Sequence, residues 1–384
     1  MSAHSQDDGL LLSGLDGTNP LGFLAALGVL QLLTTEHKSH EVTMSWSSKK
    51  GVWNPILHGV GQDQKSVSKS LARQLKCPFK PDADAGSNRE KTQEAFDEKK
   101  SQRKKVADEL KQQGLRGSER KAAEENTLNP IDKELSELRL QWLAALRQCV
   151  PSLELSLGKH LNATCSELRE QMNLALDEAS QHERNILDLY AAFGSDVCSQ
   201  DKSDQMLATN FCFITGSGHQ YFLDTVRQLI ENVTADRIEE AVFTQVEPQD
   251  EKCSMRWDPQ EDRRYAVMWS DPTASGNKAR TNWATNLLAY CGLQLLPSVP
   301  RPKGLFTTGW SEDECLAWNW PIWTGRISSW VIRSLLSHPL MTEKSVNRKA
   351  ISSLGVAAVY QSIRVQVGNP PLHKVNFTPA HRVA

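Results

Sequence analysis

Residues 15–33 read LDGTNPLGFLAALGVLQLL, and this stretch decides how the N-terminal part of the chain folds. Thr18 or Asn19 can cap a helix, and Pro20 suits the first helical position, where its missing N–H costs nothing. The residues from Pro20 to Leu33 are apolar on nearly every side. A helix with no polar face is stable only inside a core, so we predict that this one is fully buried.

Two glycines inside this segment, Gly22 and Gly28, each lower helix stability by about 1 kcal/mol relative to alanine. We therefore expect them where another backbone packs closely. A similar pattern recurs at 281–296, where eight of sixteen residues match 18–33 at a constant offset of 263. The match is either a chance similarity between apolar helices or the trace of a duplication.

The 384 residues, 39 % apolar and 23 % charged, are typical of a globular protein large enough for two or three domains. Predicted helices and strands mix without a regular alternation, so we predict an α+β fold, a mixed helical and sheet body with a charged insertion. We expect four regions: an N-terminal α/β part of the core at 1–61, a charged mobile insertion at 62–128, a mainly helical region at 129–245, and a basic, tryptophan-rich α+β region at 246–384.

The insertion at 62–128 has few apolar residues and no evident heptad seam, which is typical of a mobile helical or disordered segment. From Lys99 to Lys121 it holds nine Lys or Arg residues against three acids. Such a run is usually a solvated helix, although an arm along phosphate groups has the same composition.

Charge is unevenly distributed over a chain whose net formal charge is only -2. Residues 272–384 carry +8, and the remainder carries -10. A basic third of this kind indicates a surface that faces a polyanion, or charges spread over all faces of the domain.

Eight of the eleven tryptophans lie between Trp257 and Trp330. Three of them fall in the six residues from Trp318 to Trp323. Because alternate residues of a strand face opposite ways, we predict that some of these rings lie at a surface. Aromatic and basic side chains together suit nucleic acid or a protein partner.

Two loops carry weaker signals. Residues 215–219, TGSGH, form either a tight turn or an anion site. The anion alternative arises because glycines leave backbone N–H groups accessible at the start of a helix. Residues 256–264, RWDPQEDRR, mix acids and bases so evenly that an internal ion-pair loop is favoured over a loop that presents phosphate contacts.

No catalytic, cofactor or metal motif is present in the sequence. The eight cysteines include no CxxC pair, and no HExxH, P-loop or GxSxG pattern occurs. We expect reduced thiols in a cytoplasmic protein that is not an enzyme. The longest apolar run, Pro20–Leu33, is too short to cross a bilayer core of about 30 Å, so no membrane partner is expected.

Five segments of the sequence resemble known proteins: 13–33, 255–272, 280–300, 306–310 and 318–336. Together they resemble proteins encoded beside the effector genes of subtype I-G (formerly I-U) CRISPR-Cas systems, either large-subunit-like proteins or an extension of the CRISPR helicase-nuclease. The resemblance covers most of the chain outside 62–128, and its motifs are descriptive rather than catalytic. The chain is short for a large subunit, and no helical bundle is evident at its end.

The resemblance implies a non-enzymatic component of a type I RNA-guided DNA interference complex, with effector subunits, guide RNA and target DNA as partners. The residues expected to contact nucleic acid are Lys278, Arg280, Arg301, Lys303, Arg326 and Arg333. One alternative is a protein-interaction module that serves the helicase-nuclease without touching DNA. Another is an enzyme whose active site follows no recognised motif.

Overall fold

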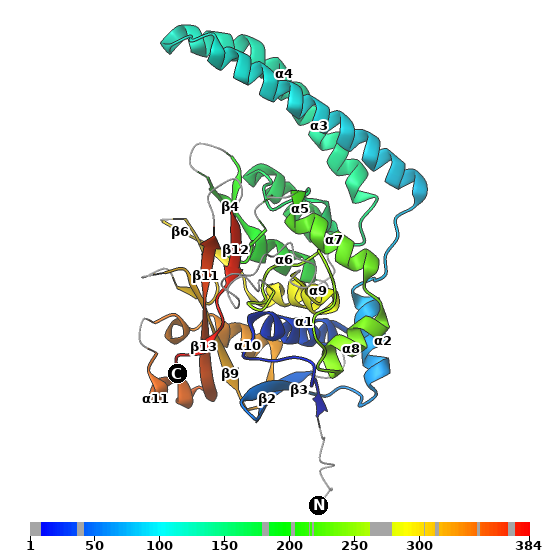
Figure 1. The fold of residues 1–384 in the computed structure, drawn as a ribbon, viewed down its shortest axis with the longest axis vertical. Helices are drawn as coiled ribbons and strands as arrows, with labels where there is room; N and C mark the ends of the chain where they lie inside the picture. The colour runs from blue at the N-terminus through cyan, green and yellow to red at the C-terminus, as the bar shows by residue number, and fades with distance from the viewer. Residues whose placement is uncertain are drawn as a thin grey trace, which may run out of the picture. The chain divides into compact units, whose positions relative to one another are not determined.

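A computed structural model of the protein describes residues 9–36, 42–178, 184–200, 204–214, 216, 219–261, 279–302, 304–311, 315–343, 346–367 and 373–384. The predicted α+β class is confirmed, because helices combine with several small antiparallel sheets (Figure 1). The chain divides into two compact units. We call residues 1–79 with 159–384 the body and residues 80–158 the hairpin unit.

The first sheet of the body has four antiparallel strands in the order β1-β3-β2-β10. Their bounds are Leu10–Leu11 for β1, Thr43–Lys49 for β2, Val52–His58 for β3 and Ile327–Ser328 for β10. Ile327 of β10 pairs with Met44 of β2. The N-terminal and C-terminal parts of the sequence therefore share one sheet.

The second sheet has the order β12-β11-β9-β8, and β13 also pairs with β11. Its strands are β8 (Trp310–Ser311), β9 (Ala317–Trp323), β11 (Val356–Val367), β12 (Lys374–Phe377) and β13 (His381–Arg382). The sequence at 353–368 is typical of a long strand or a hairpin, and the structure forms the single strand β11 there. Two ribbons complete the strands of the body: β4 (Gly194–Ser199) with β5 (Met206–Ala208), and β6 (Ser298–Arg301) with β7 (Gly304–Thr307).

The prediction that some tryptophans of β9 lie at a surface is wrong. Every residue of β9 is buried, and the rings of Trp318, Trp320 and Trp323 all pack against Phe23. Alternate side chains of β9 face opposite sides of the sheet, but both sides are covered, so every residue of the strand is buried. All three indoles therefore lie in the core of the body.

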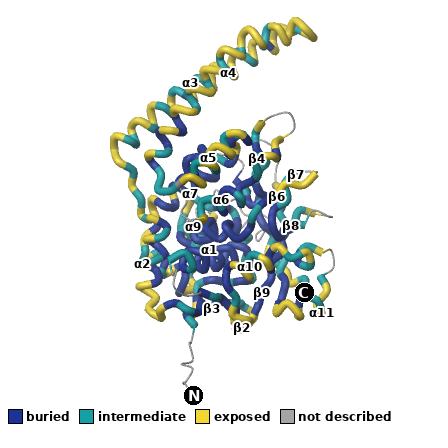
Figure 2. Tube along the Cα trace, turned by 180° about the vertical axis from the view of Figure 1, so that it is seen from behind, coloured by how far each residue is buried: buried dark blue, intermediate teal, exposed yellow. Residues whose placement is uncertain are grey.

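The helices of the body are α1 (Pro20–Glu36), α2 (Gln64–Gln74), α5 (Cys165–Glu178), α6 (Asn185–Phe193), α7 (Phe222–Asn232), α8 (Ala235–Phe243), α9 (Trp283–Gly292), α10 (Ser329–Leu336) and α11 (Arg348–Ser353). The burial of α1 is confirmed, since all its residues from Pro20 to Leu33 are buried (Figure 2). None of the helices in the described residues has the length and apolar character needed to cross a membrane.

Helix α1 packs against α9, so the two segments with matching sequence patterns lie side by side. A Cβ placed on Gly28 would meet the carbonyl oxygen of Leu288 at 1.8 Å, and one on Gly292 would meet that of Leu24 at 2.1 Å. The first turns of both helices line one cavity, which shows that they run in the same direction. The expected close backbone contact at Gly28 is confirmed.

The apolar run at 208–214 is typical of a strand, but the structure does not form one there. Only its first residue, Ala208, belongs to a strand, and the chain continues as a loop with Phe211 and Phe213 fully buried. The Trp257 indole N–H donates to the Phe211 carbonyl oxygen at 2.9 Å. The apolar run fills the core without joining a sheet.

The hairpin unit consists of two long antiparallel helices, α3 (Ala83–Gln112) and α4 (Gly117–Arg147), followed by a 3-10 turn at Leu153–Ser156. Its apolar cluster contains Phe96, Trp142, Leu143 and Leu146. The rings of Phe96 and Trp142 are stacked, with their centroids 5.5 Å apart. The unit begins and ends at 80 and 158, whereas the predicted insertion spanned 62–128. Helix α2 belongs to the body, because its apolar side packs against α8.

A heptad seam, which we did not expect, runs along both helices of this unit. Among the residues of α3 that are shielded from solvent, eight recur at alternating spacings of four and three: Ala85, Arg89, Thr92, Phe96, Lys99, Arg103, Val106 and Leu110. Six shielded residues of α4 follow the same spacing: Leu128, Ile131, Leu135, Leu138, Trp142 and Ala145. Charged residues occupy seam positions because long side chains can cover apolar surface while their heads reach a partner. Lys99 pairs with Glu134, and Arg103 pairs with Asp132.

Candidate nucleic-acid interface

The residues predicted to contact nucleic acid lie in different parts of the body. Lys278 and Lys303 fall outside the described residues. Arg280 is exposed immediately before α9. Arg301 is exposed at the end of β6, and its guanidinium carbon lies 3.5 Å from the centroid of the Phe306 ring.

Arg333 is half-buried on α10, and two partners within the fold hold its guanidinium group in place. It forms an ion pair with Asp188 at 2.8 Å, and it donates to the Gln294 carbonyl oxygen at 2.6 Å. Because Gln294 follows α9 whereas Arg280 precedes it, the length of this helix separates Arg280 from Arg333. Of the predicted residues that the structure describes, Arg280 and Arg333 therefore do not lie in one group.

Arg326 lies at one end of the second sheet. It is exposed in the turn that follows β9, whose last residue, Trp323, pairs with Val356 at the start of β11. The turn that carries Arg326 is therefore beside the beginning of β11.

Three further cations lie at this same end of β11. Helix α11, which packs against β11, carries the exposed Arg348 and Lys349. Arg382 of β13 is also exposed and pairs opposite Tyr360 of β11, and its guanidinium group donates to the carbonyl oxygens of Ala384 at 2.8 Å and of Ala357, near the start of β11, at 3.0 Å. We call Arg326, Arg348, Lys349 and Arg382 the basic edge. Only Arg326 was among the predicted contact residues, although the charge count of the C-terminal third includes all four.

An exposed tryptophan lies on α10, the helix that follows Arg326. Trp330 is 58 % exposed, and the guanidinium carbons of Arg184 and Arg333 lie 5.6 and 5.8 Å from its ring centroid. Both arginines form ion pairs with the buried carboxylate of Asp188. We call Trp330, Arg184, Arg333 and Asp188 the Trp330 cluster.

A second candidate site lies where the N-terminal turns of α1 and α9 meet. They line a cavity of about 120 Å³, into which the chain also brings Asp16 and Asp258. The Asn19 amide donates to Asp258 Oδ1 at 2.9 Å, and Asp16 accepts from the Thr18 N–H and hydroxyl, both at 2.8 Å. Asp16 thus fixes the turn before α1, and Asp258 holds the side chain of Asn19, whose Oδ1 accepts a hydrogen bond from the Leu21 N–H at 2.8 Å.

The turn that follows Asp258 holds a second buried acid whose pKa is raised. Burial, reinforced by the charge of Asp258, raises the pKa of Glu261 to about 8. Its carboxyl group accepts hydrogen bonds from the Ser254 and Thr281 hydroxyls. A raised carboxyl pKa is common in active sites, but this group joins the 254–261 loop to the start of α9. The arrangement supports a structural role for Glu261.

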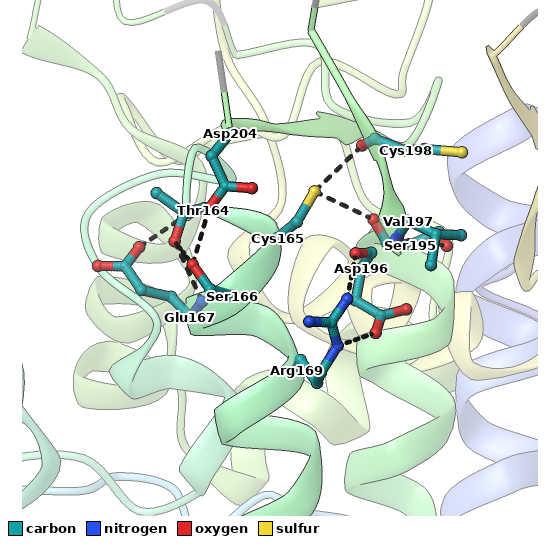
Figure 3. A network of polar contacts seen from close by, with 10 residues as sticks. All are labelled: Thr164, Cys165, Ser166, Glu167, Arg169, Ser195, Asp196, Val197, Cys198 and Asp204. Atoms are coloured by element: carbon teal, nitrogen blue, oxygen red, sulfur yellow. Dashed lines mark hydrogen bonds and ion pairs between the residues drawn. The ribbon is translucent and has the colours of Figure 1, made fainter.

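Cys165 occupies a position where thiols can be activated, because the N-terminus of a helix lowers the pKa of a cysteine placed there. It lies in the first turn of α5, where a reciprocal capping box joins Thr164 and Glu167 (Figure 3). Burial, followed by the charge of Asp204, raises the pKa of the Cys165 thiol. The thiol donates to the Cys198 carbonyl oxygen at 3.6 Å. It is therefore protonated near neutral pH, which disfavours nucleophilic attack.

The same network fastens α5 to the β4 strand. Arg169 of α5 donates to the Asp196 carboxylate at 2.8 Å, and Ser166 donates to Asp204 at 2.7 Å (Figure 3). All eight cysteines are free thiols, as expected for the chain. Within the described ranges, no three His, Cys, Asp or Glu side chains converge as metal ligands would.

Two loops singled out in the sequence lie partly outside the described residues. Thr215, Ser217 and Gly218 of the TGSGH loop, and residues 262–264 of the loop at 256–264, are not described. No protein-family model matches the sequence, and comparisons with curated proteins and with solved structures found no match either.

Proposed function

We propose that this protein is a cytoplasmic, non-enzymatic component of a type I CRISPR-Cas RNA-guided DNA interference complex, in which it contacts nucleic acid. Its partners would be the effector subunits, the guide RNA and the target DNA. The observation that carries the proposal is the basic edge, where three separate chain segments bring Arg326, Arg348, Lys349 and Arg382 to one end of a sheet.

Phosphate contacts supply most of the affinity of a protein that does not read bases, and exposed arginine and lysine side chains make them. The sequence resemblance to subtype I-G proteins supports the assignment to an interference complex. The structure adds two supporting features, since the buried Glu261 joins a loop to the start of α9 and Cys165 is held protonated. Neither arrangement favours an active site.

The second candidate is a protein-interaction module for the helicase-nuclease. Trp330 and Val331, which are 58 % and 49 % exposed, favour it because exposed aromatic side chains often anchor protein interfaces. Unlike the first candidate, it requires no contact with nucleic acid.

Co-purification and nucleic-acid binding experiments distinguish the two candidate functions. The tagged full-length protein should be expressed with subtype I-G effector subunits and guide RNA, and the purified complex compared with one lacking the protein. We expect the protein to remain with the complex and to strengthen its binding to duplex DNA. Recovery with the helicase-nuclease alone, without any effect on DNA affinity, would support the second candidate. Recovery with neither would contradict both.

A further inference from the structure

We propose that Trp330 is a stacking site for an unpaired base of a single-stranded nucleic acid, with Arg184 and Arg333 beside it to attract the flanking phosphates. The inference rests on the proposed function and deepens it by naming the form of nucleic acid bound. Its basis is the Trp330 cluster, whose geometry differs from that of the other tryptophans described.

The exposed ring is unusual within this fold. Trp257, Trp310, Trp318, Trp320 and Trp323 are all less than 2 % exposed, whereas Trp330 is 58 % exposed. An indole offers a large apolar face, and burial of that face is normally favourable. Trp330 instead points outward from α10, while Ile332 and Leu336 of the same helix are buried.

The cations around the ring are held in place by one buried carboxylate. Asp188 is only 5 % exposed. Its Oδ2 lies 2.8 Å from Nη2 of Arg333, and its Oδ1 lies 3.2 Å from Nη2 of Arg184. Arg333 also donates to the Gln294 carbonyl oxygen, which fixes its position further. Two guanidinium groups and one carboxylate leave a charge of +1 beside the ring. This charge favours an anionic ligand.

The size of the apolar patch favours a base over a protein partner. A standard protein interface buries about 800 Å² on each side, and a hot-spot tryptophan lies at its apolar centre. Here Val331 is the exposed apolar neighbour on α10, and the next exposed positions are Ser334 and Ser337. A single base needs only one ring face, and stacking of this kind contributes about 1–3 kcal/mol per base.

The test compares two strands of equal length and charge. The full-length protein is titrated by fluorescence anisotropy with labelled oligo-dT and with an abasic strand of the same length. Stacking predicts that wild type prefers oligo-dT by about 5- to 150-fold, the ratio that corresponds to about 1–3 kcal/mol. Trp330→Ala should abolish the preference while leaving abasic binding nearly unchanged, and Trp330→Phe should retain part of it.

A matched control is available at Trp283. Its ring lies 4.8 Å from the guanidinium carbon of Arg237, whose charge is balanced by its own carboxylate, Asp250, and the indole N–H donates to the Lys252 carbonyl oxygen. Trp283→Ala should preserve the base preference. Oligo-U and its abasic RNA counterpart, run in parallel, show whether DNA or RNA is the better ligand.

Other outcomes overturn the inference in distinguishable ways. Equal binding of base-containing and abasic strands by wild type, or an unchanged preference in a folded Trp330→Ala variant, would exclude stacking at Trp330 while the proposed function stands if duplex DNA still binds. If the Trp330→Ala variant keeps the preference for oligo-dT but no longer co-purifies with an effector subunit, Trp330 is a protein contact instead. Failure of wild type to bind any nucleic acid, alone or in the complex, would contradict the proposed function itself.

Discussion

Gly28 of α1 lies directly on the main-chain carbonyl of Leu288 in α9, so that a Cβ at this position would come within 1.8 Å of the oxygen. Gly292 faces Leu24 in the same way across the crossing. Together the two glycines allow α1 and α9 to approach backbone to backbone. The arrangement explains why glycine is used inside a helix despite its low propensity.

Gly28→Ala should therefore destabilise the body, because the new methyl group can be placed only by moving one helix. Overpacking of this kind typically costs about 1–3 kcal/mol, which should lower the melting temperature of the full chain by several degrees in a circular dichroism scan. Gly86→Ala on α3 is the control, since a Cβ added there would meet no atom of the described residues within 4 Å and alanine favours a helix. A melting temperature unchanged by Gly28→Ala would contradict this view of the crossing.

The pKa of Glu261 gives a pH dependence with a definite sign. Burial raises this pKa from 4.5 to about 8, so the folded protein binds the proton more tightly than the unfolded chain does. Stability from this group is fully present below pH 4.5 and is lost as pH rises towards 8. The loss should approach about 1.4 kcal/mol per pH unit within that window.

Glu261→Gln removes the titration and keeps a group that can hydrogen-bond Ser254 and Thr281. We expect the variant to gain stability over wild type as pH rises from about 5 to about 8 in urea denaturation experiments. Glu247→Gln, which removes one exposed carboxylate, should retain the wild-type pH slope. If Glu261→Gln and wild type show the same slope, Glu261 does not hold its proton in the folded state.

Much of the fold follows from local patterns, and the failures have particular causes. The apolar run with its Asn19 cap predicts α1, because helix ends and buried faces depend on neighbouring residues. The seam of the hairpin unit was missed because Arg89, Lys99 and Arg103 occupy positions where apolar residues are expected. On α4, Glu134 pairs with Lys99 and Asp132 pairs with Arg103, so these charges are neutralised at the seam. No local pattern in the sequence predicts the two ion pairs.

The candidate site was less predictable than the fold. A basic C-terminal third is visible in the composition, yet only the register of β9, β11 and β13 shows that Arg326 and Arg382 lie at one end of the sheet. Arg333 was predicted as a phosphate contact, but its partner Asp188 lies 145 residues away in sequence. Neither relationship has a signal in spacing or periodicity.

Asp188 should be among the residues most sensitive to substitution. Asp188→Ala would leave the half-buried Arg333 guanidinium without its counter-ion, and breaking a buried ion pair on one side typically costs about 3–5 kcal/mol. Arg184→Ala is the matched variant, because its side chain is 54 % exposed and an exposed pair contributes under about 1 kcal/mol. Thermal unfolding should separate the two clearly, and equal melting temperatures would show that Asp188 is not needed to neutralise Arg333.

The basic edge makes a quantitative prediction for salt dependence. If Arg348, Lys349 and Arg382 contact phosphates, changing all three to alanine releases fewer counterions on binding. The slope of log affinity against log salt for duplex DNA should then fall by about 2.7, since each contact contributes about 0.9. The loss should be nearly equal for all DNA sequences, because phosphate contacts position the protein and carry no base information. Anisotropy titrations of the full-length protein or its complex at several salt concentrations measure both effects.

The control removes the same charge elsewhere. Lys100, Lys104 and Lys105 are exposed on α3, outside the ion pairs made by Lys99 and Arg103. Their triple alanine variant should leave the slope at its wild-type value, and both variants should melt near wild type because exposed charges contribute little to stability. A reduced slope in the α3 variant, with none in the basic-edge variant, would move the phosphate contacts to the hairpin unit. Unchanged slopes in both, with DNA still bound, would place them on neither surface and contradict the basic edge as an interface.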